Sequence, residues 1–135
     1  MSERNEQVEK ELEKLVGILT EIVPQLTEIR VFGSYNNGNW NEKTSDIDIF
    51  VETEDEDYSL HGNHDPLGRI ILRAKIVKGM NKTINRKYKG RLGIHLLSVE
   101  DMEKLKGLAP QGNYMRCNMK SGRLIYQNKQ TPTAN

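Results

Sequence analysis

The chain lacks most of the features that define cross-linked, exported or membrane proteins. Cys117 is the only cysteine, which excludes an internal disulfide framework and favours the reducing cytoplasm. We expect Cys117 to be a small core residue and not a nucleophile, because it lies far along the chain from the motifs described below and no sequence feature would activate its thiol. No stretch approaches the roughly 20 apolar residues of a membrane span. The N-terminal residues are charged and lack the apolar stretch of a secretory signal, so we predict a cytoplasmic protein without a membrane partner.

A large net charge is also absent, but the charges are unevenly distributed. The formal net charge is +1, yet residues 42–57 hold eight acids and one base, Lys43. Residues 69–91 hold nine lysines and arginines and no acid. This basic segment fits a solvated helix face, or a contact with the phosphates of RNA. Aromatic residues do not alternate with these charges as a base-stacking platform requires, so RNA is the weaker interpretation.

Length and composition indicate one folded domain. The chain has 135 residues, of which 36% are apolar and 29% are charged, a balance that supports a single core. We assign residues 1–127 to this domain and residues 128–135 to a flexible polar tail.

Periodicity predicts helices and strands in a mixed order. A first helix is expected over residues 3–23, with Ser2 as its N-cap and Pro24 ending it. Later helices are expected from Pro66 to about Met80, over 98–107 after a capping box, and over 112–121. Short strands are expected at 29–32, 46–52, 92–97 and 123–126. The predicted fold class is α/β (α+β), a small mixed sheet with helices packed mainly on one side.

The second long helix carries a clear apolar stripe, which we expect to face the core. Its members recur at helical spacing and are Leu67, Ile70, Ile71, Ala74, Val77 and Met80. The loop before this helix contains His61, His64 and Asp65, which fit a polar loop with a helix cap better than a metal site.

Two short motifs carry the chemistry that we predict. An apolar strand runs into Gly33 and Ser34, and twelve residues after Ser34 a second strand begins at Asp46. Side chains two apart on a strand point the same way, so Asp46 and Asp48 share a face. Two adjacent carboxylates repel each other unless a cation lies between them, and hard oxygen ligands suit Mg²⁺, which commonly brings phosphates. A glycine turn beside such a pair therefore predicts a site for a metal-bound nucleotide.

The motifs together resemble the minimal nucleotidyltransferases of the DNA polymerase β superfamily. The resemblance rests on three segments and covers most of residues 10–127: Phe32-Gly-Ser34, Ser45-Asp-Ile-Asp-Ile-Phe-Val51 and Gly122-Arg-Leu-Ile-Tyr126. It implies transfer of a nucleoside monophosphate from a nucleoside triphosphate to an acceptor hydroxyl with Mg²⁺. It also implies a small helical protein partner, although homo-oligomerisation is equally allowed.

The resemblance implies a role for each motif residue. Gly33 and Ser34 would hold the triphosphate, with Ser45 contributing to nucleotide binding beside them. Asp46 and Asp48 would ligate Mg²⁺, or Mn²⁺ as the alternative metal, and so serve catalysis. Lys43 or a cation from residues 69–91 would supplement the charge at the phosphates.

The chain departs from the family pattern at one position. Active members usually carry a third carboxylate on the strand after the second long helix, and His95 stands at about that place. An imidazole is a poor Mg²⁺ ligand but suits Mn²⁺ or Zn²⁺, and it can also act as a general base. The alternatives are a structural strand histidine, and a catalytically impaired module that binds a nucleotide or a partner, as an antitoxin-like subunit would.

Overall fold

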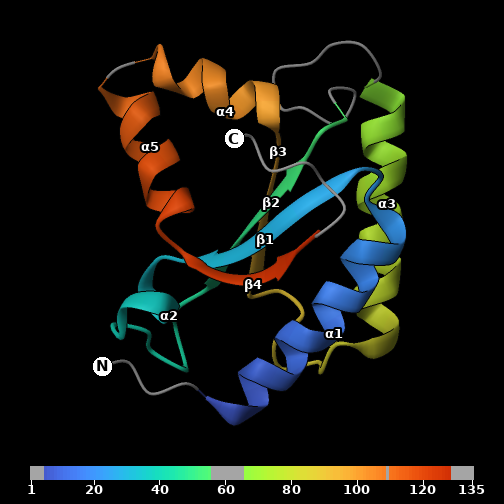
Figure 1. Cartoon of the computed structure of the whole chain (residues 1–135). Helices are drawn as coiled ribbons and strands as arrows, with labels where there is room; N and C mark the ends of the chain where they lie inside the picture. The colour runs from blue at the N-terminus through green and yellow to red at the C-terminus, as the bar shows by residue number, and fades with distance from the viewer. Residues whose placement is uncertain (1–4, 56–65, 109, 129–135) are drawn as a thin grey trace.

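The computed structural model describes residues 5–55, 66–108 and 110–128 (Figure 1). The chain order is mixed α/β, as predicted, with nine helices and strands among the described residues. Their bounds are α1 Glu6–Ile22, β1 Leu26–Phe32, α2 Ser34–Asn37, β2 Ile47–Thr53, α3 Pro66–Thr83, β3 Leu92–Ser98, α4 Val99–Lys106, α5 Gln111–Lys120 and β4 Arg123–Gln127.

The four strands form one mixed sheet in the order β3-β2-β1-β4. Strand β1 pairs antiparallel with both β2 and β4, whereas β2 and β3 are parallel. The parallel pair is possible because α3 lies between these strands in the chain and crosses over, as parallel neighbours require. The register sets Asp48 opposite Phe32 on one side and Gly93 on the other. The end of β1, the start of β2 and the start of β3 therefore meet.

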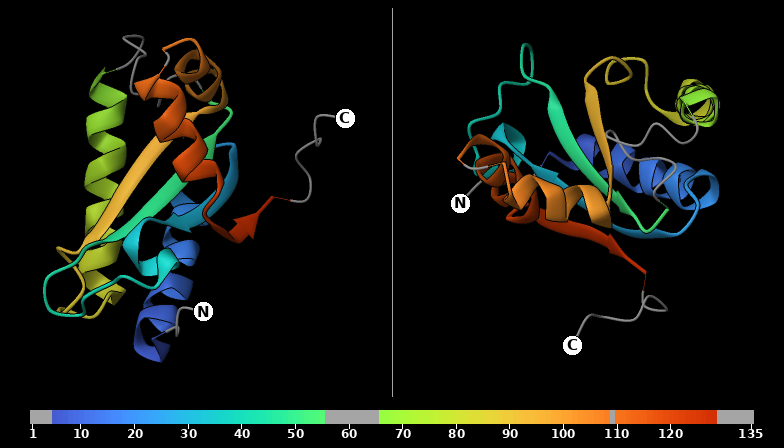
Figure 2. Two further views of the ribbon diagram at one scale, coloured as in Figure 1. Left: turned by 90° about the vertical axis from the view of Figure 1, so that its left-hand side faces the viewer. Right: turned by 90° about the horizontal axis from the view of Figure 1, so that it is seen from above.

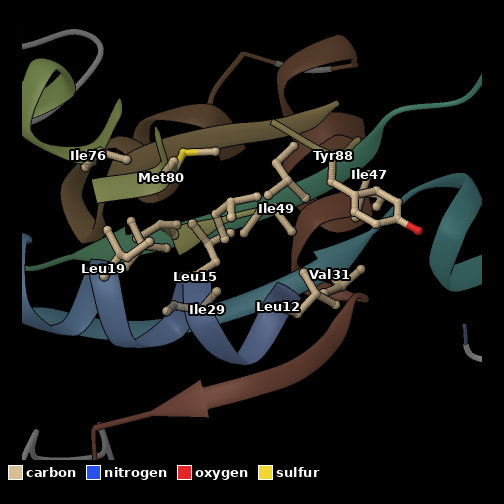
Figure 3. Close-up of a cluster of buried hydrophobic side chains, with 14 of the residues drawn as sticks. Leu12, Leu15, Leu19, Ile29, Val31, Ile47, Ile49, Ile76, Met80 and Tyr88 are labelled. Carbon is tan, nitrogen blue, oxygen red and sulfur yellow. The ribbon is translucent and has the colours of Figure 1, made fainter. Parts of the chain in front are cut away.

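Helices α1 and α3 cover one face of the sheet and enclose the larger core (Figures 1 and 3). The alternating residues Ile47, Ile49 and Val51 are completely buried on this face. Helices α4 and α5 lie on the other face of the sheet (Figure 2). There Phe50 packs with Met102 of α4 and Met119 of α5 in a smaller cluster. Strand β2 therefore has apolar residues on both faces. At its start, however, the face that carries Phe50 bears the polar Asp48.

Local sequence explains where the helices begin. Helix α1 starts later than predicted, at Glu6, because the Asn5 side chain accepts hydrogen bonds from the backbone N–H groups of Gln7 and Val8. The predicted cap Ser2 lies outside the described residues. The predicted capping box of α4 is confirmed, since the Ser98 hydroxyl accepts from the Asp101 N–H and the Asp101 carboxylate accepts from the Ser98 N–H.

The predicted inner face of α3 is wrong. The structure buries Leu72, Ile76 and Met80 against the core, whereas four residues of the predicted stripe are exposed: Leu67, Ile70, Ile71 and Val77. Helix α3 has apolar residues on two opposite faces, so periodicity could not decide which one is inside. Asp65, His61 and His64 lie outside the described residues.

Two further expectations differ from the structure at the chain's C-terminal part. Cys117 is exposed on α5 and is not a core residue. Asn128, the first residue of the predicted tail, donates its backbone N–H to the Thr27 carbonyl and is held at the sheet edge. Residues 129–135 are not described. None of the described helices is long and apolar enough to cross a membrane.

Candidate functional site

The turn after β1 needs glycine for two reasons. Gly33 has a φ of 76°, in the left-handed region that side chains disfavour. A Cβ at Gly33 would also collide with Asp48 Oδ2. The missing side chain therefore lets the backbone of the Gly33-Ser34 turn approach the Asp48 carboxylate closely, which joins the two predicted motifs in space.

The two aspartates occupy the start of β2 and are open to solvent. Asp46 is exposed just before the strand and makes no hydrogen bond or ion pair with any described residue. Asp48 lies on the strand face opposite Ile47 and Ile49, and its side chain is 36% exposed. Asp46 is separated from Asp48 by the buried Ile47, and both aspartates are open to solvent where the strand begins.

His95 lies beside Asp48, where the sequence placed it. Its Nε2 atom is 3.7 Å from Asp48 Oδ1, and its side chain is 47% exposed. The imidazole packs against the Phe32 ring, with 5.4 Å between ring centroids. His95 pairs with Phe50 across the parallel ladder, so it points to the same face as Asp48. Within the described residues, no group of three histidine, cysteine, aspartate or glutamate side chains is arranged to hold a metal ion.

Ser45 and Trp40 close the loop that connects the two motifs. The Ser45 carbonyl accepts hydrogen bonds from Trp40 Nε1 at 3.0 Å and from Arg91 Nη2 at 2.6 Å, and its hydroxyl accepts from the Asn41 N–H. The Arg91 guanidinium lies over the Trp40 ring, 5.4 Å from its centroid. These contacts fix the backbone immediately before Asp46, so Trp40 acts here as a loop anchor.

A polar network holds the other end of the same loop. The Tyr35 hydroxyl donates to Glu9 Oε2 at 2.7 Å and accepts the Asn5 N–H. Arg123 Nη2 lies 2.9 Å from both Glu9 carboxylate oxygens. Burial first, and then the hydrogen bond to Glu9, raises the pKa of Tyr35 to about 12. Tyr35 also meets Trp40 edge-on, with 5.2 Å between centroids, so the two ends of the loop brace each other.

Sequence comparison agrees with this geometry. The model of the nucleotidyltransferase domain family matches residues 12–104, more than half of the chain. The chain belongs to the nucleotidyltransferase domain family. No match to a curated protein is found. The matched segment of this nucleotidyltransferase domain contains all of the predicted site residues: Gly33, Ser34, Ser45, Asp46, Asp48 and His95.

Solved structures with a similar fold are distant in sequence. One is a protein of Sulfolobus solfataricus provisionally assigned as a nucleotidyltransferase, with 18% identity and a TM-score of 0.46, covering 96% of this chain and 95% of that chain. Another is a toxin–antitoxin complex with AMP-PNP, with 18% identity and a TM-score of 0.48, covering 87% of this chain and 74% of that chain.

The residues that support the loop of this nucleotidyltransferase domain were not predicted. Glu9 and Arg123 lie near opposite ends of the sequence, so no local sequence pattern predicts that they form an ion pair. Arg91 and Lys87 of the basic segment both reach the loop, Arg91 at the Ser45 carbonyl and Lys87 at Glu42. Lys87 pairs with Glu42 at 2.8 Å, and this contact raises the pKa of Lys87 and lowers the pKa of Glu42.

Removing the Tyr35 hydroxyl should weaken the support of the motif loop, the segment of residues 35–45 between the two motifs. It should also change how the free energy of unfolding depends on pH above 10. We expect Tyr35→Phe to destabilise the fold at neutral pH by about 2 kcal/mol, because the hydroxyl loses both its hydrogen bond to Glu9 and the one it accepts from the Asn5 N–H. In the unfolded chain a tyrosine loses its proton near pH 10, whereas Tyr35 keeps it up to about 12. Its contribution is therefore complete below pH 10 and is lost as the pH rises through 12.

Urea unfolding followed by Trp40 fluorescence at pH 8 and at pH 11 measures this difference. The stability gap between wild type and Tyr35→Phe should narrow at pH 11. Tyr114→Phe is the matched control, because Tyr114 is 77% exposed and should change stability at neither pH. A gap of equal size at both pH values would contradict the prediction.

Proposed function

We propose that this protein transfers a nucleoside monophosphate from a nucleoside triphosphate to an acceptor hydroxyl, with Mg²⁺ bound at Asp46 and Asp48. The observation that carries this proposal is the close approach of the Gly33-Ser34 turn to Asp48, with the exposed Asp46 two residues earlier in the chain. A phosphate chain bound at the turn would lie directly against the two carboxylates.

The donor set fits a hard divalent cation. Both aspartates are accessible, and Asp46 has no competing partner among the described residues. Two carboxylates leave several ligand positions to phosphate oxygens and water, as is usual for Mg²⁺. Mn²⁺ is the alternative, because the neighbouring His95 nitrogen suits it better than Mg²⁺. The metal would neutralise the triphosphate and align it for displacement.

The residues around this position account for the remaining steps. Gly33 and Ser34 would bind the triphosphate through backbone N–H groups and the Ser34 hydroxyl. The acceptor oxygen would attack the α-phosphorus, the bond to pyrophosphate would break, and the acceptor proton would pass to His95 Nε2. Asp48 Oδ1, 3.7 Å away, would stabilise the imidazolium that results. Ser45, whose hydroxyl is already occupied by the Asn41 N–H, would act by holding Asp46 in place.

The test is a turnover and binding assay on the purified chain. The protein is incubated with each of the four labelled nucleoside triphosphates and Mg²⁺ or Mn²⁺, with RNA and protein hydroxyl acceptors. We expect metal-dependent release of pyrophosphate that EDTA abolishes. Equilibrium binding of the same nucleotides is measured in parallel. Failure of every nucleotide to bind in the presence of either metal would reject the proposal.

The second candidate is a non-catalytic module that binds a nucleotide or a partner protein, as an antitoxin-like subunit would. Two observations favour it. His95 occupies the position where a third carboxylate is expected. The described parts of the chain also hold no cluster of three side chains that could bind a metal ion. This candidate predicts tight nucleotide binding without pyrophosphate release. Either candidate fits a cytoplasmic protein that acts with a protein partner or as a homo-oligomer.

A further inference from the structure

Helix α3 lies along the outer edge of the molecule (Figure 1). It carries a set of exposed apolar residues in addition to those it buries in the core. The exposed fractions are 66% for Leu67, 64% for Ile70, 47% for Ile71 and 53% for Val77. With the exposed Ala74, these residues follow the spacing of one continuous helical stripe. We call these five residues the outer face of α3.

The outer face lies opposite the buried one. At 3.6 residues per turn, the buried stripe of Leu72, Ile76 and Met80 and the outer face occupy opposite sides of the helix. A helix with apolar residues on both sides is normally covered on both. Four large aliphatic side chains gathered on one exposed helix face are also unlike the scattered apolar residues of an ordinary surface. The outer face therefore has the character of a binding surface.

Cations border the outer face on both sides. Arg73 lies at the edge near β3, and Lys75, Lys78 and Lys82 lie at the edge near α1. None of these four forms an ion pair with a described residue, and α3 contains no acid. Glu21 of α1 also lines the edge near α1, but the three lysines outnumber it. An apolar stripe with three lysines along one edge and Arg73 at the other is complementary to an amphipathic helix whose apolar face is flanked by glutamates or aspartates.

A groove extends the outer face toward the edge strand β3. It has a volume of about 250 Å³ and is lined mainly by apolar side chains, including Val77, Ile76, Met80, Ile94 and Leu96. Val77 belongs to both the groove and the outer face, so the two are continuous. A large side chain of a bound helix can insert there and fix the position of the helix.

A second copy of this chain does not match the surface. Apposing two α3 helices would bring Arg73, Lys75, Lys78 and Lys82 of both copies together. The exposed side of α1 is polar or glycine throughout, and α4 exposes only one large apolar residue, Val99. Helix α5 exposes Tyr114 and Met115 but has no acid. No described helix of the chain thus offers an acidic amphipathic face.

We propose that the outer face of α3 is the docking surface for an acidic amphipathic helix of a different protein. This inference goes beyond the proposed function, because the outer face lies on the α1 side of the sheet, away from the face that carries Asp48. It requires neither nucleotide binding nor turnover.

The test uses the full chain and a designed probe. The probe is a fluorescein-labelled peptide of about 20 residues with leucines at a and d positions and glutamates beside them. Its control is a peptide of the same composition in scrambled order. Fluorescence anisotropy at about 150 mM salt should show binding at least about tenfold tighter for the amphipathic peptide, since the scrambled one cannot present its leucines together.

Matched variants locate the bound peptide. Ile70→Ser and Ile71→Ser should each weaken binding about tenfold, because each removes one buried aliphatic contact. Tyr114→Ser, an exposed apolar residue on α5, should leave binding unchanged. Lys78→Glu should weaken the acidic peptide and favour a peptide with lysines in place of glutamates. All of these positions are exposed, so thermal unfolding should confirm an intact fold.

Four results would overturn the proposal. They are no binding of the amphipathic peptide, equal binding of the scrambled peptide, binding that Ile70→Ser leaves unchanged, and a dimer in sedimentation that Ile70→Ser disperses. Displacement of the peptide by a single-stranded RNA, with RNA affinity reduced by Lys78→Glu but not by Ile70→Ser, would assign the surface to nucleic acid instead.

Discussion

Replacing Asp48 with asparagine is expected to reduce metal-dependent pyrophosphate release by at least about a thousandfold. A metal ion on a transferring phosphoryl group supplies several kcal/mol of charge stabilisation, and each 1.36 kcal/mol is about a factor of ten in rate. Asparagine keeps the shape of the side chain but removes the negative charge that would hold the cation. Asp48 is the more severe position of the pair, because it also contacts the Gly33 turn and His95.

The fold should survive this change. Asp48 is partly exposed and lies 3.7 Å from His95, so the pair contributes little to stability. We expect the free energy of unfolding to change by less than about 0.5 kcal/mol, as for most surface substitutions. Glu54→Gln is the matched control, since Glu54 is exposed just beyond the other end of β2 and loses the same charge. Pyrophosphate release that persists in Asp48→Asn would place the metal elsewhere or remove it from the reaction.

The approach of the Gly33 turn to Asp48 could be anticipated because both motifs are short segments at the ends of two strands. Alternation fixes that Asp48 faces away from Ile47 and Ile49, which are buried on the opposite face, whatever the strand pairs with. A glycine that ends an apolar strand predicts a sharp turn. Only glycine fits at position 33 because Asp48 Oδ2 lies so close to it. This close approach depends on the register between β1 and β2. Register follows from the packed sheet and cannot be obtained from either strand alone.

Helix α3 shows where pattern reasoning fails. The stripe of Leu67, Ile70, Ile71 and Val77 is as regular as the buried one, so periodicity supports both faces equally. The choice is made by packing, because Gly79 allows α1 to approach and Ile18 contacts its backbone on the side of the buried stripe. The sequence therefore shows that α3 has two apolar stripes, but it does not show which of them faces the core.

The support of the motif loop could not be predicted for a related reason. Glu9 and Arg123 are 114 positions apart in the sequence. They meet only because the folded chain places helix α1 beside the edge strand β4. Arg91 likewise reaches the Ser45 carbonyl across the start of the β2–β3 pair. Such contacts bring together polar side chains that resemble ordinary surface residues in the sequence.

Replacing His95 with glutamine is expected to lower the rate of turnover by about two to four orders of magnitude, the usual contribution of a general base. Nucleotide affinity should stay within about twofold, because His95 is proposed to act on the acceptor proton and the triphosphate is held by other residues. A fall in kcat with an unchanged dissociation constant therefore separates this role from metal binding, which would lower both. Measuring nucleotide affinity at equilibrium and kcat in single turnovers with saturating nucleotide gives the two numbers.

His95→Asp then distinguishes an enzyme in which His95 is the general base from a non-catalytic module that lacks the third carboxylate. An aspartate at position 95 would place a third carboxylate on the same face of the sheet as Asp48, which would favour Mg²⁺ over Mn²⁺. If His95 is the base, the wild type turns over and His95→Gln does not, while His95→Asp shifts the preferred metal toward Mg²⁺. If the wild type binds nucleotide without turnover and His95→Asp creates pyrophosphate release, the chain is a nucleotide-binding module one substitution away from catalysis. His95→Asn, which has nearly the same size as aspartate without its charge, should fail to create activity in either case, because the effect requires the added carboxylate.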